Sequence, residues 1–122
     1  MMKYVLALLV LCAPAAFAQG AVGTWRTEFD TQVGAQKYLF TFKQEGAAAT
    51  GTAKAEFQGQ ARDVVFKDVR MKGDTITFTE SFEFQGNSVP ITYTGVKSGE
   101  EIKFERKVAD FATESFVARK SQ

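Results

Sequence analysis

Hydrophobic and polar residues alternate along most of the chain from Gly23 onward. The alternating segments are rich in Phe, Val, Ile and Thr, which favour strands over helices. Glycines interrupt them every 12 to 14 residues, at Gly34, Gly46, Gly59, Gly73, Gly86 and Gly99. Glycine readily adopts the positive φ that tight hairpins require. The pattern therefore predicts consecutive antiparallel strands joined by short turns, with no sustained helical period.

The intervals between the turns predict eight strands. Their expected ranges are 22–30, 37–44, 49–57, 61–71, 75–84, 87–97, 101–108 and 113–120. The last turn has no glycine and uses Ala109-Asp110. The segments share nothing beyond alternation, which argues against a repeat protein. Eight strands in up-and-down order close naturally into an antiparallel barrel, since closure removes exposed strand edges.

Residues 1–18 have the features of a secretory signal peptide. Lys3 gives a positive start, an apolar run follows from Tyr4 to Leu11, and Ala16-Phe17-Ala18 has the small-x-small pattern of a cleavage site. The apolar run is shorter than the ~20 residues of a membrane span. A lipoprotein signal ending at Cys12 is disfavoured because Leu11 is not small. We expect an exported protein, periplasmic or secreted, whose single domain spans residues 19–122.

Composition excludes several kinds of chemistry. The chain has no histidine, and its one cysteine lies in the predicted signal peptide, so Ser-His-Asp, Cys-His and HExxH sites are excluded. The predicted mature chain has no cysteine for a disulfide or zinc cluster, and no calcium-binding ligand series. We therefore expect no metal and no cofactor. The 15 basic and 14 acidic residues leave no basic face for nucleic acid.

The alternation assigns one face of each strand to the barrel interior. The expected inward residues are Trp25, Thr27, Phe29, Tyr38, Phe40, Phe42, Gly51, Ala53, Ala55, Phe57, Val64, Phe66, Ile76, Phe78, Phe82, Phe84, Val89, Ile91, Tyr93, Ile102, Phe104, Val108, Phe116 and Ala118. On the strand over 61–71, Val65 marks the competing face. The opposite faces carry charges such as Lys37, Lys103 and Glu105, so we expect a solvated surface rather than a lipid-facing one.

Three polar residues interrupt the predicted apolar faces of consecutive strands. Glu80, Tyr93 and Arg106 lie on the strands over 75–84, 87–97 and 101–108. Because buried charges are usually paired, we expect Glu80 to pair with Arg106 and Tyr93 to donate to the carboxylate. Three interpretations stay open. The group is a structural ion pair in a filled barrel, or the polar floor of a ligand cavity with Trp25 and Tyr38 as its aromatic wall, or a bulge turns one residue outward.

Two short segments carry a resemblance to known proteins. Gly23-Thr24-Trp25 resembles the Gly-x-Trp start of the lipocalin and avidin superfamily of small barrels, and Ala49-Thr50-Gly51-Thr52 is similar to the avidins' Leu-Thr-Gly-Thr segment. The resemblance implies that the tryptophan closes one barrel end against a late basic residue, here Arg119 or Arg106. Biotin binding is not implied, because the avidins bring further tryptophans to biotin and this chain has only Trp25.

The segments Gly23 to Gln32 and Arg106 to Ala118 also resemble small exported domains of environmental bacteria, whose relatives are often labelled glycoside hydrolase or xylanase-like. We therefore expect a binding protein for a small, carbohydrate-related ligand, with the candidate residues Trp25, Tyr38, Glu80, Tyr93 and Arg106. One alternative is a glycoside hydrolase that uses two carboxylates, with Glu80 and Glu114 as weak candidates. Another is a non-catalytic interaction module of the cell envelope. Ligand identity, activity and oligomeric state stay open.

Overall fold

The computed structural model describes residues 20–32 and 34–121, and they form nine antiparallel strands in one sheet. The strands are β1 (Gly23–Thr31), β2 (Gly34–Glu45), β3 (Ala48–Phe57), β4 (Gln60–Val65), β5 (Lys67–Lys72), β6 (Thr75–Phe84), β7 (Asn87–Ser98), β8 (Glu101–Val108) and β9 (Ala112–Lys120). The predicted signal peptide, with its cleavage site and Cys12, lies outside the described residues. No helix among the described residues is long and apolar enough to cross a bilayer.

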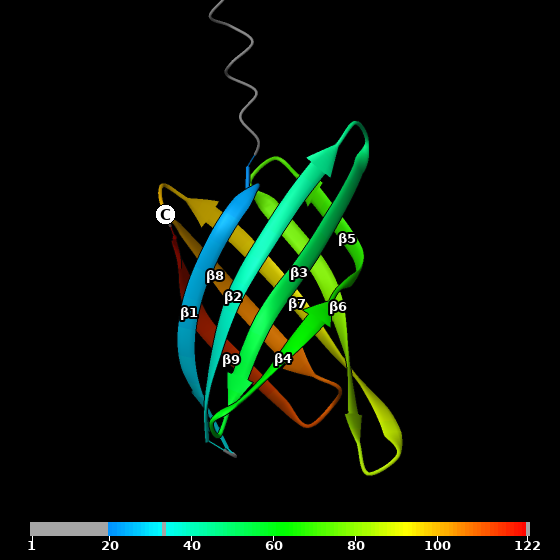
Figure 1. The fold of residues 1–122 in the computed structure, drawn as a ribbon. Helices are drawn as coiled ribbons and strands as arrows, with labels where there is room; N and C mark the ends of the chain where they lie inside the picture. The colour runs from blue at the N-terminus through cyan, green and yellow to red at the C-terminus, as the bar shows by residue number, and fades with distance from the viewer. Residues whose placement is uncertain (1–19, 33, 122) are drawn as a thin grey trace, which may run out of the picture.

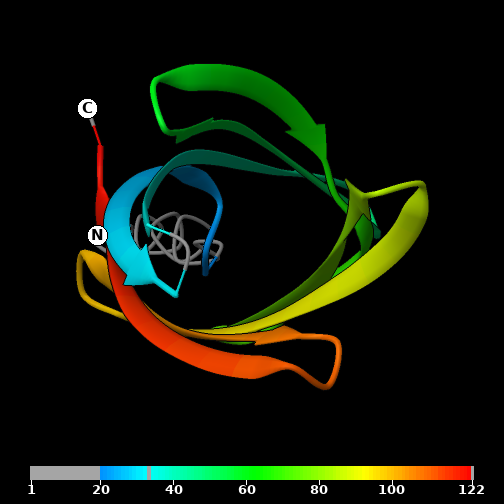
Figure 2. The same ribbon diagram turned by 90° about the horizontal axis from the view of Figure 1, so that it is seen from below.

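The sheet curls until its first and last strands lie side by side. Its order is β4-β3-β2-β1-β9-β8-β7-β6-β5, so every neighbour except the β1–β9 pair is consecutive in sequence. The β1–β9 pairing is short and matches Trp25 with Lys120 and Arg26 with Arg119. Figures 1 and 2 show the strands surrounding a common interior. The predicted all-β antiparallel fold is thus confirmed, and the sheet is nearly closed into a barrel.

The predicted number of eight strands is wrong, because the expected strand over 61–71 is divided at Phe66. Before Phe66 the chain pairs with β3, and after it with β6. Phe66 is buried, packs 4.4 Å from the ring of Phe78, and donates its backbone N–H to the Gly51 carbonyl. Asp68 has a φ of 52°, and the register shifts between Lys67 and Arg70. β4 and β5 therefore become the two edges of the sheet.

The glycine turns have the backbone that the sequence predicts. All six turn glycines have positive φ. In the hairpins between β3 and β4 and between β6 and β7, the preceding residue has it too: Gln58 at 55° before Gly59, and Gln85 at 54° before Gly86. Two successive positive values are typical of a type I′ turn, whose twist matches that of the flanking strands.

Side chains fill most of the barrel. The largest fully buried ones are Trp25, Tyr38, Tyr93, Phe40, Phe42, Phe78, Ile76, Ile102 and Glu80. Small residues make room for these rings: a Cβ at Gly95 would lie 2.5 Å from the ring of Phe104. Every residue of the buried hydrophobic core within the predicted strands belongs to the inward set predicted above. Phe84, also predicted inward, has a side chain outside the described ones.

Candidate functional site

A buried carboxylate stands at the centre of a polar network inside the barrel. Glu80 lies in the middle of β6 and is 0% exposed. The hydroxyl of Tyr93 donates to its Oε1 at 2.7 Å, and the hydroxyl of Tyr38 donates to the same oxygen at 3.0 Å. Nη2 of Arg62, on β4, donates to Oε2 at 3.1 Å and completes an ion pair. Burial of the charge is tolerable because each carboxylate oxygen has donors and a counter-ion is present.

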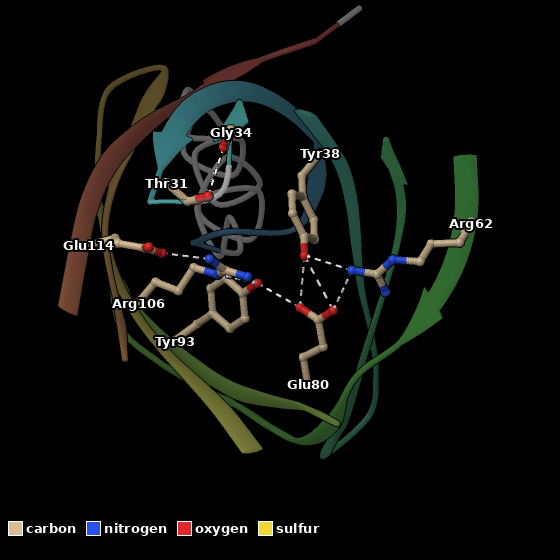
Figure 3. A network of polar contacts seen from close by, with 8 residues as sticks. All are labelled: Thr31, Gly34, Tyr38, Arg62, Glu80, Tyr93, Arg106 and Glu114. Atoms are coloured by element: carbon tan, nitrogen blue, oxygen red, sulfur yellow. Dashed lines mark hydrogen bonds and ion pairs between the residues drawn. The ribbon is translucent and has the colours of Figure 1, made fainter. Parts of the chain in front are cut away.

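Arg106 extends this network across three strands. Tyr93, Arg106 and Glu114 are direct register partners on β7, β8 and β9. Arg106 donates through Nε to the Tyr93 hydroxyl at 3.0 Å and through Nη1 to Glu114 Oε1 at 2.6 Å. Its guanidinium also lies 5.2 Å from the ring centre of Phe29. Figure 3 shows the two arginines reaching the tyrosine hydroxyls from opposite walls of the barrel.

Burial and the neighbouring charges shift the proton equilibria of the network. Burial, reinforced by the proximity of Tyr38 and Glu80, raises the pKa of Tyr93 well above its ordinary value. Burial and Glu80 likewise raise the pKa of Tyr38. Burial alone would lower the pKa of Arg106, but the oxygens of Tyr93, Tyr38 and Glu114 outweigh it, so that pKa lies above its ordinary value. At neutral pH both phenols are therefore protonated donors and the guanidinium is charged.

The predicted pairing of Glu80 with Arg106 is wrong. The ion pairs are Arg62 with Glu80 and Arg106 with Glu114, and the Tyr93 hydroxyl bridges the two pairs. The predicted donation from Tyr93 to Glu80 is present. Sequence reasoning missed Arg62, although it stands two residues before Val64 and so shares the predicted inward face. The signal that identifies Arg62 is this position on the face of Val64, since a cation there can pair with a buried carboxylate.

Trp25 makes none of the hydrogen bonds of this network, and its register partner on β2 is Phe40 rather than Tyr38. Its indole N–H donates to the Ala21 carbonyl at 2.9 Å. The basic group over its ring is Lys120, whose Nζ is 5.0 Å from the ring centre. The resemblance implied Arg119 or Arg106 in that place, but Arg119 pairs with Glu101 and Arg106 belongs to the network. Register explains the difference, because Lys120 is the direct partner of Trp25.

A pocket of about 200 Å³, here called the mouth pocket, opens next to the network. Its lining residues come from the strand ends near the hairpins β1–β2, β3–β4, β6–β7 and β8–β9. These hairpins lie at the lower end of the ribbon in Figure 1, which Figure 2 shows from below. The pocket lining consists of Thr31, Gln32, Gln36, Phe57, Arg62, Phe82, Ile91, Arg106, Val108, Phe111, Ala112 and Glu114. The pocket thus combines apolar walls with two guanidiniums and one carboxylate.

The mouth pocket includes only one of the predicted ligand-binding residues, Arg106. Tyr38, Glu80 and Tyr93 are buried behind it. Every fully buried polar side-chain atom of the described residues has a hydrogen-bond partner. These three side chains hold Arg62 and Arg106 in place at the inner end of the pocket. Phe111, on the β8–β9 hairpin, is 75% exposed and forms part of the rim.

The two carboxylates considered for glycoside hydrolysis are each held in an ion pair. Glu80 is bound to Arg62 and is out of reach of the pocket, and Glu114 is bound to Arg106 at its edge. Glu114 lines the pocket, whereas Glu80 does not. Among the described residues, no group of three or more acidic, histidine or cysteine side chains is arranged to hold a metal ion.

A wider hollow of about 850 Å³ lies against β1, β2, β3 and β9. Most of its lining residues are exposed and point outward, including Lys37, Lys54, Glu56 and Arg119. It is an open surface depression rather than a site built around buried polar groups. The mouth pocket is smaller, but it is the one to which both buried-network arginines are directed.

No protein-family model, curated protein or solved structure matches the chain. The resemblance to lipocalins and avidins therefore stays a prediction that rests on the short segments quoted above.

Proposed function

We propose that this is an exported protein that binds a small ligand in the mouth pocket. The observation that carries the proposal is the lining of that pocket, where Arg62, Arg106 and Glu114 meet the side chains of Phe57 and Phe82. Ligand sites commonly combine an apolar wall with a few fixed polar groups that orient the ligand. Here the buried tyrosines and Glu80 fix the positions of both arginines, because they accept hydrogen bonds from the guanidinium groups on the inner side of the pocket.

The size of the pocket limits the ligand to a single ring. The volume of the mouth pocket is about 200 Å³. It is smaller than the ~300 Å³ at the lower end of ordinary ligand pockets. One sugar unit or a similar amphipathic ring suits it, whereas a longer glycan would extend past Phe111 into solvent. The carbohydrate-related ligand expected from the sequence is therefore proposed as a single unit.

Filling the pocket tests this function. Ala112 points into the mouth pocket, so Ala112→Phe places a ring where the ligand would lie. Thr113→Phe is the matched control, because it puts the same ring on the exposed outer face of the same strand. A panel of monosaccharides, uronic acids and small aromatic compounds is screened by thermal denaturation. A ligand at 100 times its Kd adds about 2.7 kcal/mol and raises Tm by several degrees.

We expect at least one compound to raise the Tm of the wild type and of Thr113→Phe, and to leave Ala112→Phe unchanged. A compound that stabilises all three proteins equally binds elsewhere and contradicts the proposed site. No stabilisation by any member of the panel would argue against small-ligand binding at the mouth.

A further inference from the structure

Both arginines of the mouth pocket use only part of their hydrogen-bonding capacity within the protein. Arg62 donates through Nη2 alone, to Glu80 and to the Tyr38 hydroxyl. Arg106 donates through Nε and Nη1. Among the described residues, Nε and Nη1 of Arg62 and Nη2 of Arg106 have no hydrogen-bond partner. A guanidinium carries five N–H donors, so several remain free.

These free donors face the mouth pocket. Both arginines line it, and the Arg62 side chain is 39% exposed. The Arg106 side chain is almost fully buried. Every fully buried polar side-chain atom of the described residues has a hydrogen-bond partner, so an atom without one cannot be fully buried. The unpaired Nη2 of Arg106 must therefore touch open space, and the space that Arg106 lines is the mouth pocket.

The counter-charges of the two arginines differ in their position relative to the pocket. Glu80 is 0% exposed and does not line the pocket, and Glu114 directs Oε1 to Arg106. The Arg62–Glu80 pair therefore presents its positive end to the pocket, whereas Glu114 lines the pocket beside Arg106 and is 15% exposed against 4% for that arginine. A ligand group that accepts several hydrogen bonds at once is favoured beside the free donors of the two arginines.

We infer that the ligand of the mouth pocket carries a carboxylate, bound by the free N–H groups of Arg62 and Arg106. The inference rests on the proposed function. A carboxylate is planar and matches the fork of a guanidinium, which makes such pairs stronger than neutral hydrogen bonds. The guanidinium of Arg62 lies 5.3 Å from the ring centre of Phe82, and Arg106 lies against Phe29, so both forks are held by aromatic faces.

The remainder of the ligand packs against the apolar wall. Phe57, Phe82 and Val108 surround the space beside the arginines, and the volume admits one ring. Two classes of carboxylate ligand satisfy these conditions: a sugar acid and an aromatic acid. Both present a carboxylate on a ring with a flat or apolar face, and the experiment separates them.

Calorimetric titration with charged and neutral counterparts provides the test. The probes are D-glucuronate against D-glucose, and benzoate against benzamide, each titrated into the wild-type protein at neutral pH. We expect at least one carboxylate to bind about tenfold more tightly, or better, than its neutral counterpart, the usual gain from a hydrogen-bonded charge. Glucuronate and benzoate identify which source the pocket prefers.

The variant Arg62→Met/Glu80→Gln removes one guanidinium together with its buried counter-charge, so that no lone charge is left inside the barrel. Its carboxylate affinity should fall about tenfold, with little change for the neutral counterparts. Lys54→Met is the matched control, since it removes one cation from the outer face one strand away, where Lys54 pairs with Asp63. Binding by this control should equal that of the wild type.

The outcomes separate the inference from the proposed function. If neutral counterparts bind as tightly as the carboxylates, and Ala112→Phe abolishes both, the pocket binds ligands but the carboxylate inference is overturned. If Lys54→Met weakens binding as much as the double variant does, the loss of affinity comes from the lower net positive charge of the protein and not from the pocket arginine. The inference is then again overturned. If none of the four probes binds, the inference fails for these acids, and the wider panel decides the proposed function.

Discussion

At the scale of single residues, the structure explains how a carboxylate is kept in the middle of an aromatic core. Glu80 receives hydrogen bonds from two phenols and one guanidinium, and Arg62, the cation that neutralises it, reaches in from the edge strand β4. Removing a buried ion from water costs several kcal/mol, which only close pairing and hydrogen bonding offset. Glu80 therefore depends on residues from three other strands.

A double-mutant cycle on Arg62 and Glu80 measures this dependence. Arg62→Met leaves the buried carboxylate with two phenols and no counter-ion, so we expect a loss of about 2–3 kcal/mol in the free energy of unfolding. Glu80→Gln should cost less, because Arg62 is 39% exposed and can turn toward water. The double variant should be more stable than Arg62→Met alone. Strictly additive losses, measured by urea denaturation, would show that the two side chains are not coupled.

At the scale of elements, the hairpins and the divided strand fix where the site forms. The β3–β4 hairpin brings Arg62 to the barrel end, and the β8–β9 hairpin does the same for Glu114 and Phe111. The break at Phe66 then sends the chain from β3 across to β6. β5 pairs with β6 only from Thr75 to Thr79, so beyond that point the side chain of Arg62 on β4 can reach Glu80.

The β3–β4 and β6–β7 hairpins can be stabilised at their turns. Gln58 and Gln85 both adopt positive φ immediately before a glycine. Asparagine tolerates this conformation better than glutamine, and Asn-Gly is the preferred pair of a type I′ turn. Gln58→Asn and Gln85→Asn should each raise the free energy of unfolding by about 0.5 kcal/mol, seen as a higher Tm. Glu100→Asn is the control, since Glu100 is not among the positive-φ residues, and an equal gain there would contradict the explanation.

At the scale of the whole molecule, the barrel is a single filled core with one polar layer near its mouth. The aromatic rings above the layer pack against each other, as in Phe66 and Phe78, whose ring centres are 4.4 Å apart. Below the layer the interior opens into the mouth pocket. The same side chains thus close the core and form the inner end of the pocket, so the stability of the whole barrel depends on their protonation.

Alkaline pH should therefore unfold the protein. Tyr38 and Tyr93 have a raised pKa in the folded state, so they stay protonated at a pH where the unfolded chain loses those protons. Stability is fully present below the ordinary tyrosine pKa of about 10 and falls as pH rises above it. The slope is up to about 1.4 kcal/mol per pH unit for each tyrosine.

Urea denaturation between pH 8 and pH 11 measures this slope, with Tyr38→Phe/Tyr93→Phe as the comparison. The double variant starts from a lower stability, because Glu80 loses two donors, but it should lose less stability per pH unit above about pH 10. Equal slopes in the two proteins would show that the buried phenols do not carry the alkaline transition.

The sequence by itself predicted the strand class, the turn positions and the residues that face inward. These depend on alternation and on glycine, which are local properties of the chain. The sequence also predicted that Glu80 and Tyr93 lie on neighbouring strands and are joined by a hydrogen bond, because consecutive strands of a meander lie side by side.

Only the tertiary structure decided which charges pair and where an open space remains. The division at Phe66 depends on a ring packing against Phe78, a contact between separate strands that leaves no mark in the alternation. The division makes β4 an edge strand, so Arg62 rather than Arg106 becomes the counter-ion of Glu80. Register likewise places Lys120 against Trp25 and Glu114 against Arg106. Register and packing are relations between segments that are distant in sequence. They explain why the structure has the ion pairs Arg62–Glu80 and Arg106–Glu114 beside a pocket, instead of the single predicted pair of Glu80 with Arg106.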